Sequence, residues 1–165
     1  MDLFEGTQKF AFHMEVRDSY AVPEEAEPLR RFLAGESEED DGYDNNDWID
    51  LVTTLAARGV GMSRIRVVTV PHSDYQRWLL SVTGSSVDAG EDIRYVARDS
   101  VDRASIPTDD WWLFDDAIVA FNLTDHEARP VGPGITTDPG VVGYCREARE
   151  RLWKLAIPYE EYVRR

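Results

Sequence analysis

The feature that most constrains the fold is a β-branched run that stops at a proline. The run consists of Ile65, Val67, Val68 and Val70, and Pro71 follows it. β-Branched side chains favour the pleated surface of a sheet, and proline cannot supply the N–H that a central strand donates. We therefore expect residues 64–70 to form a well-buried central strand, with Arg64 and Arg66 on its other face.

The rest of the chain alternates between the two periods of regular structure. Residues 10–17 alternate apolar and polar side chains, as in a half-buried strand. Ser73, with Gln76 three residues later, has the form of a helix-capping box. The same patterns predict further helices at about 24–34, 47–58, 73–83 and 139–156, and further strands at about 91–98, 111–114 and 118–123.

This order of elements predicts an α+β fold. We expect a mostly antiparallel sheet with helices packed on it, within a single domain spanning residues 1–165. The alternative is a small three-layer α/β arrangement. In that case strand 64–70, helix 73–83 and strand 92–98 form one right-handed parallel crossover.

Length and composition fit one domain with its own core. The chain has 165 residues, of which 42% are hydrophobic, and no apolar run approaches the roughly 20 residues of a membrane-spanning helix. The N-terminus lacks the basic start and apolar stretch of a secretory signal, so we expect a cytoplasmic protein that does not contact membranes. Cys145 is the only cysteine, which excludes an internal disulfide and a cysteine-based zinc cluster, and we expect it to be a small buried side chain.

The charge is strongly acidic and unevenly distributed. The formal net charge is −14, which opposes direct binding to nucleic acid. Residues 24–50 hold eleven acidic and two basic residues, and we expect a mobile, exposed acidic loop at about 36–46. This run is either a solvated surface or a docking surface for a basic partner. It lacks the ligand spacing of a calcium-binding loop.

A second acidic segment surrounds two tryptophans. Asp109, Asp110, Asp115 and Asp116 bracket Trp111 and Trp112 in a predicted hairpin. Neighbouring residues of a strand point to opposite faces, so one tryptophan is expected to be buried and the other to be exposed or covered by the last helix. The carboxylates have three interpretations: Asp110 or Asp115 paired with Arg64, Arg66, Arg94 or Arg98, a partner-binding surface, or a metal or catalytic site.

A third group of polar residues lies near predicted strand ends. His72, Ser73 and Asp74 follow the central strand, but adjacent residues of one turn rarely form a catalytic triad, and we expect Ser73 to cap the next helix. Side chains at strand ends often face a cleft. A candidate pocket at the rim of the sheet would bring together Arg66, His72, Asp74, Tyr75, Glu91 and Arg94.

Several blocks of sequence resemble a known family. They are Phe10 to Tyr20 with the following Val22-Pro23-x-Glu25, Arg64 to Val68, Pro71-x-Ser73-Asp74-Tyr75, Ala89 to Tyr95, and Asp109 to Asp116. Together they resemble an actinobacterial family of unknown function, abundant in Streptomyces and often encoded beside helix-turn-helix regulators. The resemblance implies a bacterial cytoplasmic protein in a regulatory context, and it implies no particular activity.

Two functional hypotheses follow from the sequence. The first is an accessory or regulatory domain whose acidic surface docks a basic protein partner, such as a DNA-binding regulator. Its docking residues would be Glu36, Glu38, Glu39, Asp40, Asp41, Asp109, Asp110, Trp111, Asp115 and Asp116. The second is a small-molecule sensor or an enzyme that uses the candidate pocket. A DNA-mimicking or purely structural role is a further alternative, and no cofactor or metal is expected under any of them.

Overall fold

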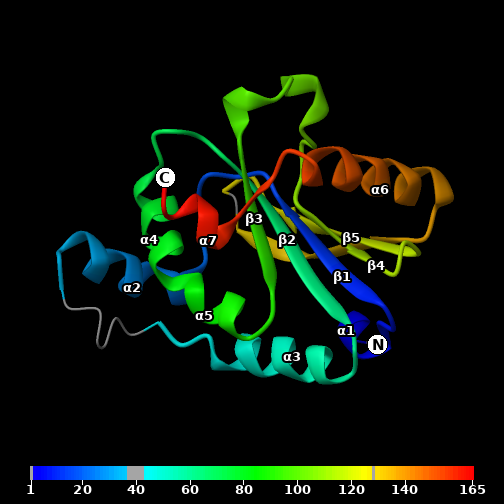
Figure 1. Cartoon of the computed structure of the whole chain (residues 1–165), viewed down its shortest axis with the longest axis horizontal. Coiled ribbons are helices and arrows are strands. Elements are labelled where there is room, and N and C mark those ends of the chain that lie inside the picture. The colour runs from blue at the N-terminus through cyan, green and yellow to red at the C-terminus, as the bar shows by residue number, and fades with distance from the viewer. Residues whose placement is uncertain (1, 37–42, 128) are drawn as a thin grey trace.

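The computed structural model describes residues 2–36, 43–127 and 129–165 (Figure 1). The helices are α1 (Leu3–Gly6), α2 (Pro23–Leu33), α3 (Asn46–Ala57), α4 (Asp74–Val82), α5 (Gly84–Asp88), α6 (Pro139–Trp153) and α7 (Tyr159–Tyr162), with two 3₁₀ turns at Arg98–Ser100 and Arg103–Ser105. The strands are β1 (Phe10–Glu15), β2 (Gly61–Val68), β3 (Asp92–Ala97), β4 (Trp111–Phe114), β5 (Ile118–Thr124), β6 (Pro130–Thr136) and β7 (Ile157–Pro158). No helix in these ranges is both long enough and apolar enough to cross a membrane.

The described strands form one mixed sheet in the order β6-β5-β4-β1-β2-β3-β7. The α+β class is confirmed, but the expectation of a mostly antiparallel sheet is wrong in detail, because β1, β2 and β3 run parallel at its centre. The reason lies in the connections: α2 and α3 connect β1 to β2, and α4 and α5 connect β2 to β3. These helices return the chain to the end of the sheet where the previous strand began, so the next strand runs parallel to it. The alternative interpretation therefore placed the 64–70 and 92–98 strands correctly as a parallel pair.

Strand β6 was not predicted from the sequence. Its residues, Pro130 to Thr136, include two prolines and two glycines, which resemble a turn. The strand pairs only with β5 and lies at one edge of the sheet, where a missing backbone N–H breaks no second ladder. The same edge position explains why an irregular sequence is tolerated there.

One face of the sheet is apolar and is covered by α6. Phe12 and Met14 of β1 and Trp111 of β4 pack there against Cys145 and Leu152, which confirms that Cys145 is buried. Figure 1 shows α6 on one side of the strands, whereas α3 and α5 lie on the other side. The sheet is therefore the middle layer of three.

The other face of the sheet carries polar side chains in the middle of its packed area. Ala11 of β1 and Phe114 of β4 pack against α3 at one end of this face. Further along β1, the side chains on the same face are His13 and Glu15, both less than a tenth exposed. A second apolar cluster, formed by α2 and α4 around Trp78, lies beyond them. Polar groups are thus enclosed between two apolar regions.

The start of α4 confirms the predicted cap. The Ser73 hydroxyl oxygen accepts a hydrogen bond from the backbone N–H of Gln76 at 3.1 Å. The same hydroxyl donates to the backbone carbonyl of Asp18 at 2.7 Å, which ties the segment after β1 to the segment after β2. These two contacts fix where Tyr75, the next inward-facing residue of α4, enters the structure.

Candidate functional site

Glu15 is the centre of a buried group of charges, here called the ionic cluster: Glu15, Arg64, Arg66 and Glu91. Arg66 Nε donates to Glu15 Oε2 at 2.7 Å, and Arg64 Nη1 donates to Glu15 Oε1 at 2.5 Å. Arg64 Nε donates to Glu91 Oε1 at 2.8 Å. The register of the parallel strands places Glu15 opposite Arg66 and therefore on the same face.

Neighbouring elements hold the ionic cluster in place. Arg66 Nη1 donates to Thr83 Oγ1 at 2.7 Å and to the Tyr95 hydroxyl at 3.0 Å. The indole N–H of Trp48 donates to Glu91 Oε2 at 2.9 Å. Residues at the end of α4 and on β3 therefore hold Arg66, a residue of α3 holds Glu91, and the cluster is fixed from several directions.

The surroundings keep Glu15 ionised and His13 neutral. Burial alone would raise the pKa of Glu15, but Arg64 and Arg66 together hold it far below its usual range. Burial lowers the pKa of His13 to about 3, with Glu15 acting in the opposite direction, so the imidazole is uncharged at neutral pH. Its ring stacks on Trp112 at 4.1 Å, and its Nε2 lies 3.0 Å from Asn122 Nδ2.

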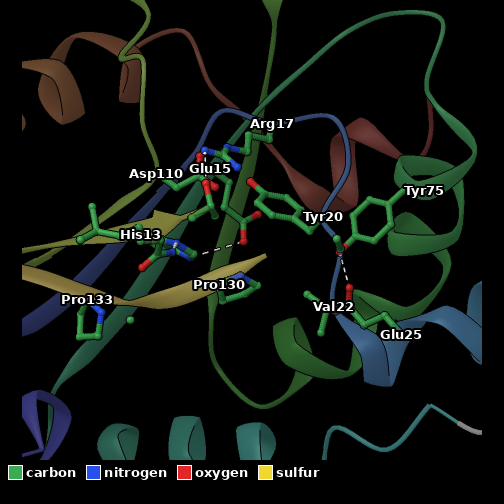
Figure 2. Close-up of a pocket in the computed structure, with 15 residues that line it drawn as sticks. His13, Glu15, Arg17, Tyr20, Val22, Glu25, Tyr75, Asp110, Pro130 and Pro133 are labelled. Atoms are coloured by element: carbon green, nitrogen blue, oxygen red, sulfur yellow. Dashed lines mark hydrogen bonds and ion pairs between the residues drawn. The ribbon is translucent and has the colours of Figure 1, made fainter. Parts of the chain in front are cut away.

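Two adjoining cavities open above this polar face. The Tyr20 cavity, of about 380 Å³, lies between the end of β1, the 17–22 segment and the β5–β6 pair, and Tyr20, Asp110 and Pro130 line it (Figure 2). The Trp48 cavity, of about 320 Å³, is lined by the ionic cluster together with Trp48 and Trp112. Glu15, Glu25 and Tyr75 line both cavities, so the two are neighbours.

The Tyr20 cavity contains two further carboxyl groups. Glu25 Oε2 accepts a hydrogen bond from the Tyr75 hydroxyl at 2.6 Å, and Asp110 Oδ1 accepts one from the backbone N–H of Val16 at 2.7 Å. Burial raises the pKa of Glu25 and of Asp110, with the Tyr75 and Tyr20 hydroxyls respectively opposing the change. These carboxyl groups are therefore easier to protonate than Glu15.

The structure brings together three residues of the predicted pocket. Arg66, Tyr75 and Glu91 line the Trp48 cavity. Arg94 does not. It stands between Ile93 and Tyr95 on β3, so its side chain points to the opposite face, the α6 face, where it lies over the Trp153 ring. His72 instead bonds to the Tyr162 hydroxyl at 2.9 Å, and the exposed Asp74 pairs with Arg77. The prediction was wrong for Arg94, His72 and Asp74 because it did not establish which face or turn each would occupy.

The predicted docking residues are also divided. Trp111 is fully buried and Asp110 nearly so, and neither belongs to an exposed surface. Trp112 is partly buried against Trp48, so α3 covers it, not the last helix. Glu36 and Asp109 are exposed, whereas Glu38, Glu39, Asp40 and Asp41 lie outside the described residues, as does most of the predicted loop at 36–46.

Asp115 and Asp116 have structural partners. Both adopt positive φ angles, 52° and 54°, in the turn between β4 and β5. The Asp115 carboxylate accepts hydrogen bonds from the backbone N–H groups of Gln8, Lys9 and Phe10 at 2.8–2.9 Å. Asp116 pairs with Arg149 of α6 at 3.0 Å.

The predicted pairing of Asp110 or Asp115 with arginines of the sheet is therefore wrong. Both carboxylates accept backbone N–H groups, and the arginines have other partners. Arg64 and Arg66 pair with Glu15, Arg94 with Asp92 and Arg98 with Asp18.

The sequence reasoning missed the centre of the site. Glu15, His13, Trp48, Tyr20 and Glu25 were not proposed as site residues. One signal was available: polar side chains occupy alternate positions on both strands, with His13 and Glu15 on β1 and Arg64 and Arg66 on β2. The expectation that Asp110 belongs to an exposed hairpin hid its role in the Tyr20 cavity.

Comparison with known proteins gives a match over nearly the whole chain. Residues 1–164 match the sequence model of a domain of unknown function, DUF6879. A search of curated proteins finds no match. Within the ranges that the structure describes, no group of three or more His, Cys, Asp and Glu side chains is arranged to hold a metal ion.

Proposed function

The chain belongs to the DUF6879 family, a domain of unknown function, and we propose that it binds a small molecule in the Tyr20 and Trp48 cavities. The observation that carries this proposal is the position of the ionic cluster at the wall of the Trp48 cavity, with its Glu15 also lining the adjoining Tyr20 cavity. Binding sites for small molecules are concave and combine apolar walls with a few converging polar groups. Here Trp48, Trp112 and Pro130 supply apolar surface, and the cluster supplies the polar groups.

The energetics of the cluster support a functional role. Burying ions costs several kcal/mol each, and apolar side chains of similar volume often stabilise a fold equally well. Charged side chains with strongly shifted pKa values beside a cavity are typical of functional sites. Glu15 and His13 have such shifts, and both line the Tyr20 cavity.

A cavity-filling substitution tests this proposal. Ala21 is exposed and lines the Tyr20 cavity, so Ala21→Trp is expected to occupy the cavity without disturbing the core. In a thermal-shift screen of cellular metabolites, we expect a ligand at 100 times its Kd to raise the Tm of the unmodified protein by about 5–10 °C. Ala21→Trp is expected to abolish that shift.

The matched control is Ala104→Trp, which adds the same side chain at an exposed position that lines neither cavity. It is expected to keep the full shift. A ligand that stabilises the Ala21→Trp variant as strongly as the control would bind elsewhere, and the proposal would be wrong.

The acidic charge favours a second candidate function. We propose as an alternative that the domain docks a basic protein partner, such as a helix-turn-helix regulator, through the acidic run at residues 24–50. The supporting observation is the net charge of −14, concentrated in that run. The regulatory, cytoplasmic setting in actinobacteria that the sequence resemblance implies belongs to this proposal.

Charge neutralisation tests the docking proposal. We expect a pull-down from the native host to retain a basic protein at low salt and to lose it at about 0.5 M salt, because screening weakens exposed charge pairs. Converting Glu38, Glu39, Asp40 and Asp41 to their amides is expected to cause the same loss at low salt. The control is the amide form of four exposed acids elsewhere in the chain, Glu147, Glu150, Glu160 and Glu161, which changes the net charge equally. Equal loss from both variants would contradict docking through this run.

A further inference from the structure

Two carboxyl groups of the Tyr20 cavity have no cation beside them. Among the described residues, no Lys, Arg or His nitrogen lies within 4.0 Å of the carboxylate of Glu25 or of Asp110. Their hydrogen-bond donors are neutral: the Tyr75 hydroxyl for Glu25 and a backbone N–H for Asp110. Glu15, in contrast, contacts two guanidinium groups. Glu15 therefore has positively charged partners, whereas the carboxyl groups of Glu25 and Asp110 have none among the described residues.

Burial makes this lack of positive charge costly. A desolvated carboxylate without a cation is less stable than one in water, which is why the pKa values of Glu25 and Asp110 are raised. Arg17 is the basic side chain that lines the same cavity, and its Nη2 donates to Thr124 Oγ1 at 3.1 Å. It lowers the pKa of Asp110 only as the weakest of five effects, and the buried His13 is neutral. Charged groups facing the cavity therefore leave it negative.

Aromatic rings stand beside these carboxyl groups. The centroids of the Tyr20 and Tyr75 rings lie 5.8 Å apart, with the ring planes inclined by 56°. Figure 2 shows the Tyr20 ring between the Tyr75 ring on one side and Glu15 and Asp110 on the other, with Glu25 below Tyr75. The faces of tyrosine rings attract cations, and this attraction grows when the cation leaves water. Burial raises the pKa of both phenols, which therefore stay neutral.

From these observations we infer that the Tyr20 cavity binds a small organic cation. Its ammonium or guanidinium group lies in the cavity beside the Tyr20 and Tyr75 rings, which pack too closely to admit it between them, and bonds to the carboxylate of Glu25. Asp110, which lines the same cavity, contributes negative potential. Its apolar part lies against Val22, Pro130 and Pro133, which line the same cavity. This inference rests on the proposed function and adds the class of ligand to it.

Isothermal titration calorimetry with charge-matched probes tests this inference. The probes are 2-phenylethylamine and agmatine as cations, and 3-phenylpropionate as an anion similar in shape to the first. At pH 7.5 we expect both cations to bind and the anion to give no heat. Affinity for the cations is expected to fall as the pH is lowered to 5, because Glu25 and Asp110, whose pKa values are raised, take up protons.

Matched substitutions assign the binding to this cavity. Glu25→Gln keeps the shape of the side chain but removes its charge, and we expect it to weaken cation binding about tenfold or more. Tyr20→Leu is expected to weaken it as well, through loss of the ring face. Asp74→Asn, which removes an exposed charge outside the cavity, is expected to leave the affinity unchanged.

The possible failures of the two proposals can be told apart. Binding of 3-phenylpropionate without the cations, or cation binding that Glu25→Gln and Tyr20→Leu leave unchanged, would overturn the inference. So would the absence of heat from both cations at millimolar concentration. The proposed function would survive each of these results if a ligand of another class raises the Tm of the protein and Ala21→Trp abolishes that rise. It would fail together with the inference if Ala21→Trp leaves the rise unchanged.

Discussion

Glu15→Ala is expected to lower the free energy of unfolding by about 3–5 kcal/mol. The substitution removes the carboxylate that both Arg64 and Arg66 contact, and all three side chains are about a tenth exposed or less. Arg64 retains Glu91, whereas Arg66 is left with neutral partners only, Thr83 and Tyr95. A buried charge without a counter-ion is among the most destabilising changes in a protein. Urea unfolding at pH 7 measures the effect.

A control variant and a double variant show whether the loss of stability comes from the unpaired charge of Arg66. Arg77→Ala breaks an exposed ion pair with Asp74 and is expected to change stability little. The double variant Glu15→Met with Arg66→Met removes both charges and is expected to be more stable than Glu15→Ala, because no unpaired guanidinium remains next to the cavity. A loss below about 1 kcal/mol for Glu15→Ala would mean that the cluster is not held as described.

Trp111→Ala is expected to cost a similar amount, about 3–5 kcal/mol, for a different reason. The Trp111 ring is fully buried, and it packs against Phe12, at a centroid distance of 5.7 Å, in the cluster that contacts α6. Removing it leaves a large cavity in the apolar half of the molecule. Thermal and urea unfolding of the variant check this value.

The same substitution decides between a core role and an interface role for Trp111. The exposed Tyr144 on α6 is the control, and Tyr144→Ala is expected to change stability little. If Trp111→Ala had normal stability but lost a protein partner, the residue would belong to a docking surface, and the packing described for this face would be wrong.

Local patterns were sufficient to predict most elements of this fold. The alternation from Phe10 to Val16 predicted β1, and Ser73 correctly predicted where α4 begins. The pairing of strands was not predictable in this way, because the direction of a neighbouring strand depends on the path of the connecting helices and not on the period of the strand itself. Strand β6 was missed because proline and glycine usually indicate a turn, and only its edge position makes a strand of this composition possible.

The site was harder to predict than the fold, since its contacts are long-range. Arg64 and Arg66 reach Glu15 across 49 and 51 residues of sequence, so no local motif records the cluster. The rim of the sheet was correctly identified as a place where Arg66, Tyr75 and Glu91 could meet. Assigning Arg94 to the same place failed because the alternation along β3 predicts a strand but does not show which of its side chains face the cavities.

The measurement that tests the central claim most directly is chemical-shift mapping by NMR on ¹⁵N-labelled protein titrated with a ligand from the thermal screen. Binding in the two cavities is expected to shift the backbone amides of Tyr20, Glu25 and Tyr75 and the indole N–H of Trp48, which donates to Glu91. Resonances of exposed residues on α6, such as Tyr144, are expected to stay in place. Shifts confined to exposed residues of α6, with the cavity residues unchanged, would contradict the claim.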